Sequence, residues 1–163
     1  MQIPPEWQSI WHDVSRILIS YFLALPVGWY RETEGHSVGV RTFPLVSMAA
    51  CGYILLGSPE HNNTIDAQSR IIQGVVTGIG FIGGGAILRA RGNVHGTATA
   101  ASIWNSGVIG AAVAQDRVFV AASLTLINLF ALRVLLPLKL KLDARAEKKR
   151  ESHPAHVRKT TAG

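Results

Sequence analysis

The stretch TGIGFIGGGAIL carries a spacing that is associated with phosphate binding. Gly78, Gly80 and Gly83 fit the pattern G-x-G-x-x-G, in which a turn between a strand and a helix holds the pyrophosphate of a dinucleotide. Such a site also needs an acidic residue about 20 positions further on to bind the ribose. The sequence has no Asp or Glu between Asp66 and Asp116. We therefore reject a nucleotide-binding function.

Transport of a divalent cation is the second chemistry to consider. Mg²⁺ is bound through oxygen atoms and typically takes one or two carboxylates. Three long uncharged segments, residues 42–59, 71–88 and 96–115, contain no Asp or Glu. This argues against an acidic relay inside a membrane but leaves open a path lined by backbone carbonyl groups. Magnesium stays as an alternative ligand, and we expect no other cofactor.

The sequence offers no grouping of residues that suggests catalysis. Its six histidines are scattered along the chain, without the spacing that metal ligands require. It also lacks a recognisable Ser/His/Asp or Cys/His arrangement. We therefore expect a protein that is not an enzyme.

Polar residues near or inside the uncharged segments are the remaining candidates for function. Asp66 and Arg70 predict either an ion pair across one helical turn, worth about 0.2–0.5 kcal/mol, or a polar entrance in which Asp66 orients Arg70. Arg41 is either an interface anchor or a partner of Glu32. Gln73 should face another helix, because lipid cannot satisfy its amide. The full candidate set is Arg31, Glu32, Arg41, Thr42, Asp66, Arg70, Gln73, Thr77, Thr99, Trp104 and Asn105.

The elements that must position these residues are membrane-length helices. The three uncharged segments are 18, 18 and 20 residues long, and a helix rises about 1.5 Å per residue across a hydrocarbon core of about 30 Å. Residues 17–30 and 118–132 nearly qualify as well. We predict an all-α, polytopic membrane helix bundle with about five transmembrane helices. It occupies residues 1–138, and residues 139–163 form a basic, largely disordered cytoplasmic tail.

Charge predicts how the bundle sits in the membrane. Most of the 16 Lys and Arg residues lie at positions 31–41, at 89–91 and in the tail, whereas Arg16, Arg70 and Arg117 lie on the opposite side. The positive-inside rule then places the N-terminus outside and the C-terminus in the cytoplasm. The basic tail lacks interleaved aromatic residues, so we expect it to contact membrane lipid and not nucleic acid.

Glycines in the third and fourth segments predict close helix packing. Gly74 with Gly78, and Gly80 with Gly84, form small-x-x-x-small ridges on different faces of one helix, which allow two backbones to approach closely. We expect the third and fourth helices to form the central pair, and exposed ridges are compatible with a homodimer. Whether the triple glycine breaks the helix is left open. The predicted packing residues are Gly74, Gly78, Gly80, Gly83, Gly84, Gly85, Gly107 and Gly110.

Three ordered motifs resemble the MgtC/SapB family of bacterial membrane proteins. They are RTFPLV at residues 41–46, the stretch from Asp to Leu at 66–88, and VHGTATAASIW at 94–104. The resemblance implies an inner-membrane protein that is linked to growth in low magnesium, to acid stress and to survival of pathogens inside macrophages. It also implies a regulatory role through contact with the ATP synthase.

The chain departs from the family pattern in three places. Tyr30 stands where the family has the first acid of an acidic-Arg-acidic stretch, and Ala98 stands in a segment that reads Gly-Leu-Thr-Thr in the family. Longer members carry a soluble C-terminal domain, and this sequence has a basic tail there. Two functions therefore compete: a non-catalytic regulator that packs against a membrane partner, and a magnesium carrier.

Overall fold

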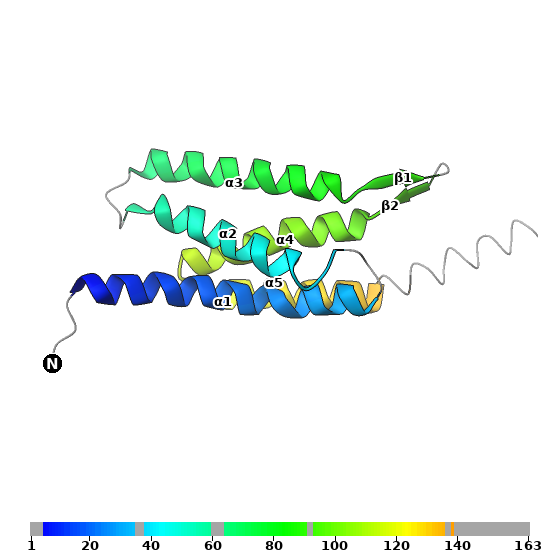
Figure 1. The fold of residues 1–163 in the computed structure, drawn as a ribbon, viewed down its shortest axis with the longest axis horizontal. Coiled ribbons are helices and arrows are strands. Elements are labelled where there is room, and N and C mark those ends of the chain that lie inside the picture. Colours follow the sequence, from blue (N-terminus) through cyan, green and yellow to red (C-terminus); the bar gives the residue numbers. More distant parts are fainter. Residues whose placement is uncertain (1–4, 35–37, 60–63, 91–92, 136–137, 139–163) are drawn as a thin grey trace, which may run out of the picture. The chain divides into compact units, whose positions relative to one another are not determined.

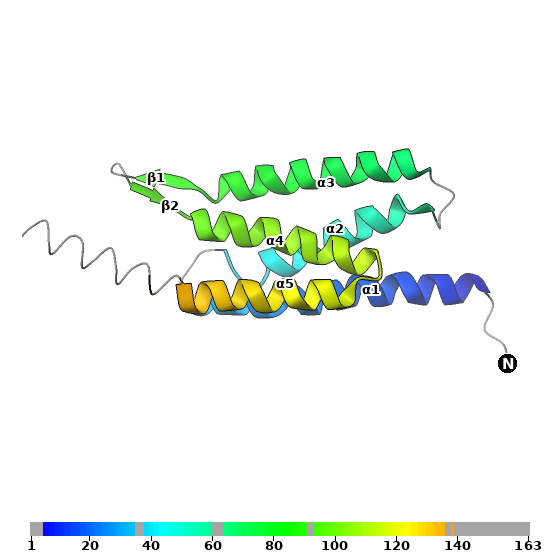
Figure 2. The same ribbon diagram turned by 180° about the vertical axis from the view of Figure 1, so that it is seen from behind.

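A computed structural model describes residues 5–34, 38–59, 64–90, 93–135 and 138 (Figures 1 and 2). The chain divides into two compact units, Met1–Leu129 and Phe130–Gly163. The described part of the second unit consists mainly of a π-helical turn, Ala131–Leu135. The predicted tail at 139–163 lies outside the described residues, so its disorder stays a prediction.

Five α-helices and one short hairpin make up the described secondary structure. The helices are α1 (Pro5–Thr33), α2 (Thr42–Leu56), α3 (Ile65–Gly85), α4 (Thr97–Ala114) and α5 (Val118–Phe130). The strands β1 (Leu88–Ala90) and β2 (Asn93–His95) lie between α3 and α4. Successive helices run in alternating directions, as Figure 1 shows. The prediction of an all-α fold with five helices is confirmed for the described residues.

Length and composition identify one helical segment that could cross a membrane, Val118–Leu135, among the residues that the structure describes. The helix α2 is strongly apolar but has only 15 residues. The other helices contain charged, glycine or hydroxyl residues that reduce their apolar character. That all five helices cross a membrane therefore stays a prediction.

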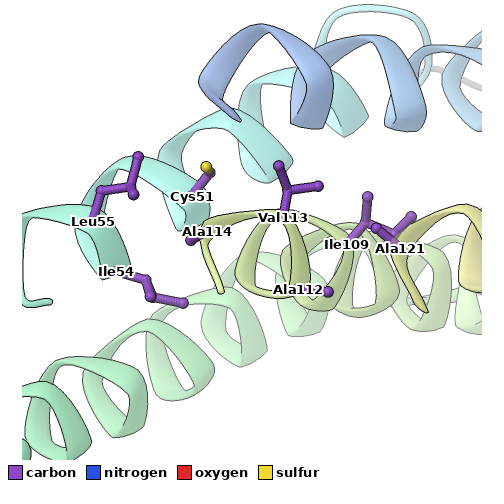
Figure 3. Close-up of a cluster of buried hydrophobic side chains, with 8 residues drawn as sticks. All are labelled: Cys51, Ile54, Leu55, Ile109, Ala112, Val113, Ala114 and Ala121. Carbon is purple, nitrogen blue, oxygen red and sulfur yellow. The ribbon is translucent and has the colours of Figure 1, made fainter. Parts of the chain in front are cut away.

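The helix α4 lies at the centre of the first unit, in contact with α1, α2 and α3. Its most extensive partner is α2, because Gly110 lets the two backbones meet: a Cβ atom at Gly110 would overlap the carbonyl oxygen of Ser47. A cluster of buried apolar side chains continues this contact, and Figure 3 shows Cys51 and Ile54 of α2 near Val113 of α4. The prediction that the third and fourth helices form the central pair is wrong, because α4 contacts α2 more extensively than it contacts α3.

The helix α3 packs on one side only, with Ile79 and Gly83 as its buried residues. A Cβ atom at Gly83 would lie 3.2 Å from the carbonyl oxygen of Ala100, and one at Gly107 would overlap the side chain of Ile79. These two glycines, with Gly110, do serve helix packing within the chain. The predicted packing glycines with open space at the Cβ position are Gly74, Gly78, Gly80, Gly84 and Gly85.

The triple glycine ends α3 without breaking it. The helix continues through Gly85 and is followed by the antiparallel hairpin, in which Leu88 pairs with His95 and Ala90 with Asn93. The chain then enters α4 through Gly96, whose φ of 85° is accessible to glycine without strain. From the sequence, the third helix was predicted to extend to residue 88, and this hairpin was not predicted.

We expect Gly110→Ala to destabilise the protein by about 1–3 kcal/mol, because the added methyl group must displace the backbone of α2. The matched control is Gly80→Ala in α3, where a Cβ meets open space. It should leave stability unchanged or raise it by up to about 1 kcal/mol through helix propensity. Thermal unfolding of the detergent-solubilised variants measures both effects, and equal stability of the two variants would contradict the packing described here.

Candidate functional site

Two buried arginines on α1 mark the polar regions of the first unit. Arg16 lies in the first half of the helix and Arg31 in its last turn, with exposed fractions of 4% and 1%. The other buried polar residues are serines and threonines: Ser20, Ser47, Ser58, Thr99, Ser102, Ser106 and Thr125. No Asp or Glu is buried among the residues that the structure describes.

Arg31 lies against the first turn of α4. Its Nη2 donates a hydrogen bond to Oγ1 of Thr99, which is also buried. The Nε and Nη1 atoms of Arg31 are buried and have no hydrogen-bond partner among the described residues. A guanidinium group stays charged under all ordinary conditions, and a buried donor without an acceptor costs about 1–3 kcal/mol or more. We call this place the Arg31 corner.

The connection from α1 to α2 packs against the same turn of α1. Gly28 gives room for the backbone of Gly39, whose carbonyl oxygen would lie 3.0 Å from a Cβ at that position. Oε2 of Glu32 accepts a hydrogen bond of 2.8 Å from the backbone N–H of Val40. Glu32 therefore holds this connection in place. Arg41 is exposed at the start of α2, and the alternative in which it pairs with Glu32 is not formed in the described residues.

A line of hydroxyl groups runs along α4 from the Arg31 corner. Thr99, Ser102 and Ser106 recur at helical spacing on one buried face. Oγ of Ser102 donates to Oδ1 of Asn128 on α5 at 3.0 Å, and Oγ of Ser106 donates to the carbonyl oxygen of Ser102 at 3.0 Å. Nδ2 of Asn105 donates to the carbonyl oxygen of Leu124 at 3.4 Å, so Asn105 faces α5. Polar groups thus join α4 to α1 and α5.

Arg16 forms an ion pair at the opposite end of α4. Its Nε donates to Oδ1 of Asp116 at 2.8 Å, and its Nη2 contacts Oδ2 of the same carboxylate. His12 and Asp13 lie at the edge of this pair, each with one contact of 3.9 Å. This pair was not predicted from the sequence. The available signal was that Arg16 lies on the same predicted side of the membrane as Arg117, the sequence neighbour of Asp116.

The predicted candidates on α3 do not come together with the Arg31 corner. Asp66, Arg70, Gln73 and Thr77 are all exposed. Asp66 and Arg70 form no ion pair among the described residues, and Oγ1 of Thr77 donates to the carbonyl oxygen of Gln73 at 2.9 Å. Gln73 faces no other helix among the described residues, so the expectation that it faces one stays a prediction that a helix of another chain would have to meet.

Two apolar hollows adjoin α3. A groove of about 850 Å³ lies between α2 and α3 and is lined by residues including Thr42, Tyr53, Gly74, Gly78 and Phe81. Phe81 is 85% exposed. A smaller hollow of about 170 Å³ involves Trp104, Ile79 and Gly107. Their apolar linings suit hydrocarbon or another helix better than an ion.

The described residues contain no group of three or more His, Cys, Asp or Glu side chains that could hold a metal ion. Oxygen atoms on the buried face of α4 come from hydroxyl, amide and backbone groups. A dehydrated Mg²⁺ ion would find no carboxylate there, although carboxylates are its usual protein ligands.

Comparisons with known proteins agree on one family. A model described as the MgtC family matches residues 17–140. Protein SrpB of Synechococcus elongatus is 33% identical over 119 residues, which cover 65% of each chain. Protein MgtC of Brucella abortus is 26% identical over 151 residues, or 93% of this chain and 63% of that protein. The chain thus spans less than two thirds of the length of these relatives.

A third relative carries a name that refers to magnesium. The Escherichia coli K12 protein named "Putative magnesium transporter YhiD" is 31% identical over 103 residues, which are 60% of this chain and 48% of that protein. No solved structure matches the chain.

The ion pair between Arg16 and Asp116 should be measurable by a double-mutant cycle. Asp116→Asn removes the carboxylate but introduces a residue that also tolerates the positive φ of 58° at this position. Arg16→Gln removes the buried charge of the guanidinium group. We expect a coupling energy of about 1–2 kcal/mol, reduced by the exposure of Asp116.

The matched control is the cycle of Asp66→Asn with Arg70→Gln on α3, where no ion pair forms. Its coupling should stay below about 0.5 kcal/mol. Thermal or denaturant unfolding measures both cycles, and similar couplings for the two pairs would refute the geometry of the pair between Arg16 and Asp116.

Proposed function

The chain belongs to the MgtC family, and from this premise we propose that it is a non-catalytic regulator in the bacterial inner membrane. It would help the cell adapt to magnesium limitation, acid stress and life inside a host by packing against a membrane partner. The magnesium-related name of one relative supports the general area of function. The regulatory mechanism and the partner are our proposals.

The observation that carries this proposal is the open surface of α3. Five glycines on two sides of this helix have open space where a side chain would be, and two of them, Gly74 and Gly78, line an apolar groove between α3 and α2. Glycine is conformationally costly in a helix, at about 1 kcal/mol per residue relative to alanine. A run of glycines that packs against nothing in its own chain suits contact with a second helix in lipid.

We propose a membrane protein such as the ATP synthase as the partner, in line with the family resemblance, with a homodimer as the other candidate. The alternating direction of the helices, seen again in Figure 2, supports a multi-pass arrangement. Five passes would put the two ends of the chain on opposite sides of the membrane, and the distribution of Lys and Arg favours an outer N-terminus and a cytoplasmic C-terminus.

A magnesium carrier is the second candidate function. It is favoured by the buried hydroxyl groups of Thr99, Ser102 and Ser106 with the half-buried amide of Asn128, which could replace some of the water around an ion. It is disfavoured because no described acidic residue is buried. Carboxylates are the ligands that a reluctantly dehydrating Mg²⁺ ion normally uses.

We expect photo-crosslinking in living cells to capture a membrane protein on α3. A photoreactive residue at position 80 or 84 would lie on the open glycine face, whereas one at position 109 on α4, where Ile109 is fully buried, provides the control. The first two positions should give a discrete cross-linked product and the control should give none. Recovery of lipid alone would count against the regulator; recovery of a second copy would favour the homodimer.

Flux measurements separate the regulator from the carrier. Purified protein in liposomes that contain a magnesium indicator should give the same signal as empty liposomes. If the protein instead admits Mg²⁺, and Asn105→Leu reduces the flux by removing the amide that bonds to α5, the carrier function is correct. A flux that Gln73→Leu on the exposed face of α3 reduces equally would indicate nonspecific leakage.

A further inference from the structure

Arg31 forms no ion pair with any acidic residue that the structure describes, although Glu34 attracts its charge from a greater distance. The side chain is 1% exposed, and of its five N–H donors the three on Nε and Nη1 find no acceptor among the described residues. Among the described residues, its side chain donates one hydrogen bond, to the neutral hydroxyl of Thr99. A buried charge that is neither paired nor fully hydrogen-bonded is strongly unfavourable. Such a group therefore points to an anion that completes it.

The acidic residues next to Arg31 in the sequence do not provide this anion. Glu32 uses its carboxylate to accept the backbone N–H of Val40. Glu34 is exposed at the end of α1, and no ion pair joins it to Arg31 in the described part of the chain. Water cannot compensate either, because both free nitrogen atoms are shielded from solvent.

The first turn of α4 adds a second, independent source of positive potential. The first backbone hydrogen bond of this helix joins the N–H of Ala100 to the carbonyl oxygen of Gly96. The N–H groups of Thr97, Ala98 and Thr99 precede it and therefore lack an intrahelical acceptor. Gly96, at the N-cap, provides no side-chain cap. A helix of 18 residues presents roughly half a positive charge at such an end.

Arg31 and the start of α4 meet at one point, because Thr99 belongs to the first turn and accepts the hydrogen bond of Arg31. We propose that the Arg31 corner binds a phosphate group, carried either by an anionic lipid headgroup or by a soluble phosphate compound. Guanidinium groups and helix N-termini both bind phosphate well, through several N–H donors that converge on its oxygen atoms.

A phosphate group suits this corner for reasons of charge and position. It has more acceptor oxygens and more negative charge than a carboxylate, which matches the three free donors of Arg31 together with the backbone N–H groups. The corner also lies at the end of the bundle where Arg41 begins α2. The charge distribution predicts that this end is cytoplasmic, where lipid phosphates would be nearby. Because the free nitrogen atoms are shielded, we expect a bound group to exchange slowly.

The test measures thermal unfolding of the full chain with defined probes. Inorganic phosphate is added to the protein in uncharged detergent, and in a separate arm the protein is placed in nanodiscs of phosphatidylglycerol or, as a reference, phosphatidylcholine. At about 100 times the dissociation constant, the effective probe should raise the melting temperature by about 5–10 °C. If inorganic phosphate raises the melting temperature, the bound phosphate group comes from a soluble compound. If phosphatidylglycerol alone raises it, the phosphate group belongs to a lipid.

Matched variants assign any response to the Arg31 corner. Arg31→Gln should abolish the shift, whereas Arg117→Gln, which removes an exposed positive charge at the other end of α4, should retain it. If Arg31→Gln does not fold, Arg31→Lys keeps the charge but loses the planar donor set, and its shift should be less than half that of Arg117→Lys. The proposal is wrong if neither probe stabilises the unmodified protein, or if the Arg31 and Arg117 variants respond equally.

Discussion

The close contact between α2 and α4 is the constraint on which the other contacts of the first unit depend. At Gly110 the backbone of α4 approaches the carbonyl oxygen of Ser47 so closely that no side chain fits between them. Because the two backbones are so close, the apolar residues of both helices form one buried cluster. It also leaves α4 in contact with α1, so that the hydroxyl-bearing face of α4 meets the polar residues of α1.

The two buried arginines of α1 are satisfied to different degrees. Arg16 is neutralised by the carboxylate of Asp116, which follows the last turn of α4. Among the described residues, Arg31 donates only to the hydroxyl group of Thr99, in the first turn of the same helix. One end of α4 therefore has a complete ion pair, whereas the other has a positive charge and a positive helix end together. This asymmetry distinguishes a structural ion pair from a place that is suited to bind an anion.

The third helix has a different role from the helices around the core. Most of its surface is exposed, and most of its glycines meet nothing within the chain. Hydrophobic attraction between helices is absent in lipid, so close backbone contact becomes the main source of affinity there. A helix with this surface is suited to contact another protein.

The sequence by itself determined the number and approximate positions of the helices, because uncharged segments of membrane length between charged loops have few other solutions. It also identified the family and the packing role of Gly83, Gly107 and Gly110, and it named Arg31 and Thr99 as separate candidates. Tertiary structure decided that Arg31 and Thr99 touch, that Arg16 pairs with Asp116, and that α2 is the main partner of α4. It also decided that Gln73 and most of the α3 glycines face outwards. The physical reason is that spacing along one helix defines which residues share a face, whereas the neighbour of that face depends on contacts between residues that are far apart in the chain.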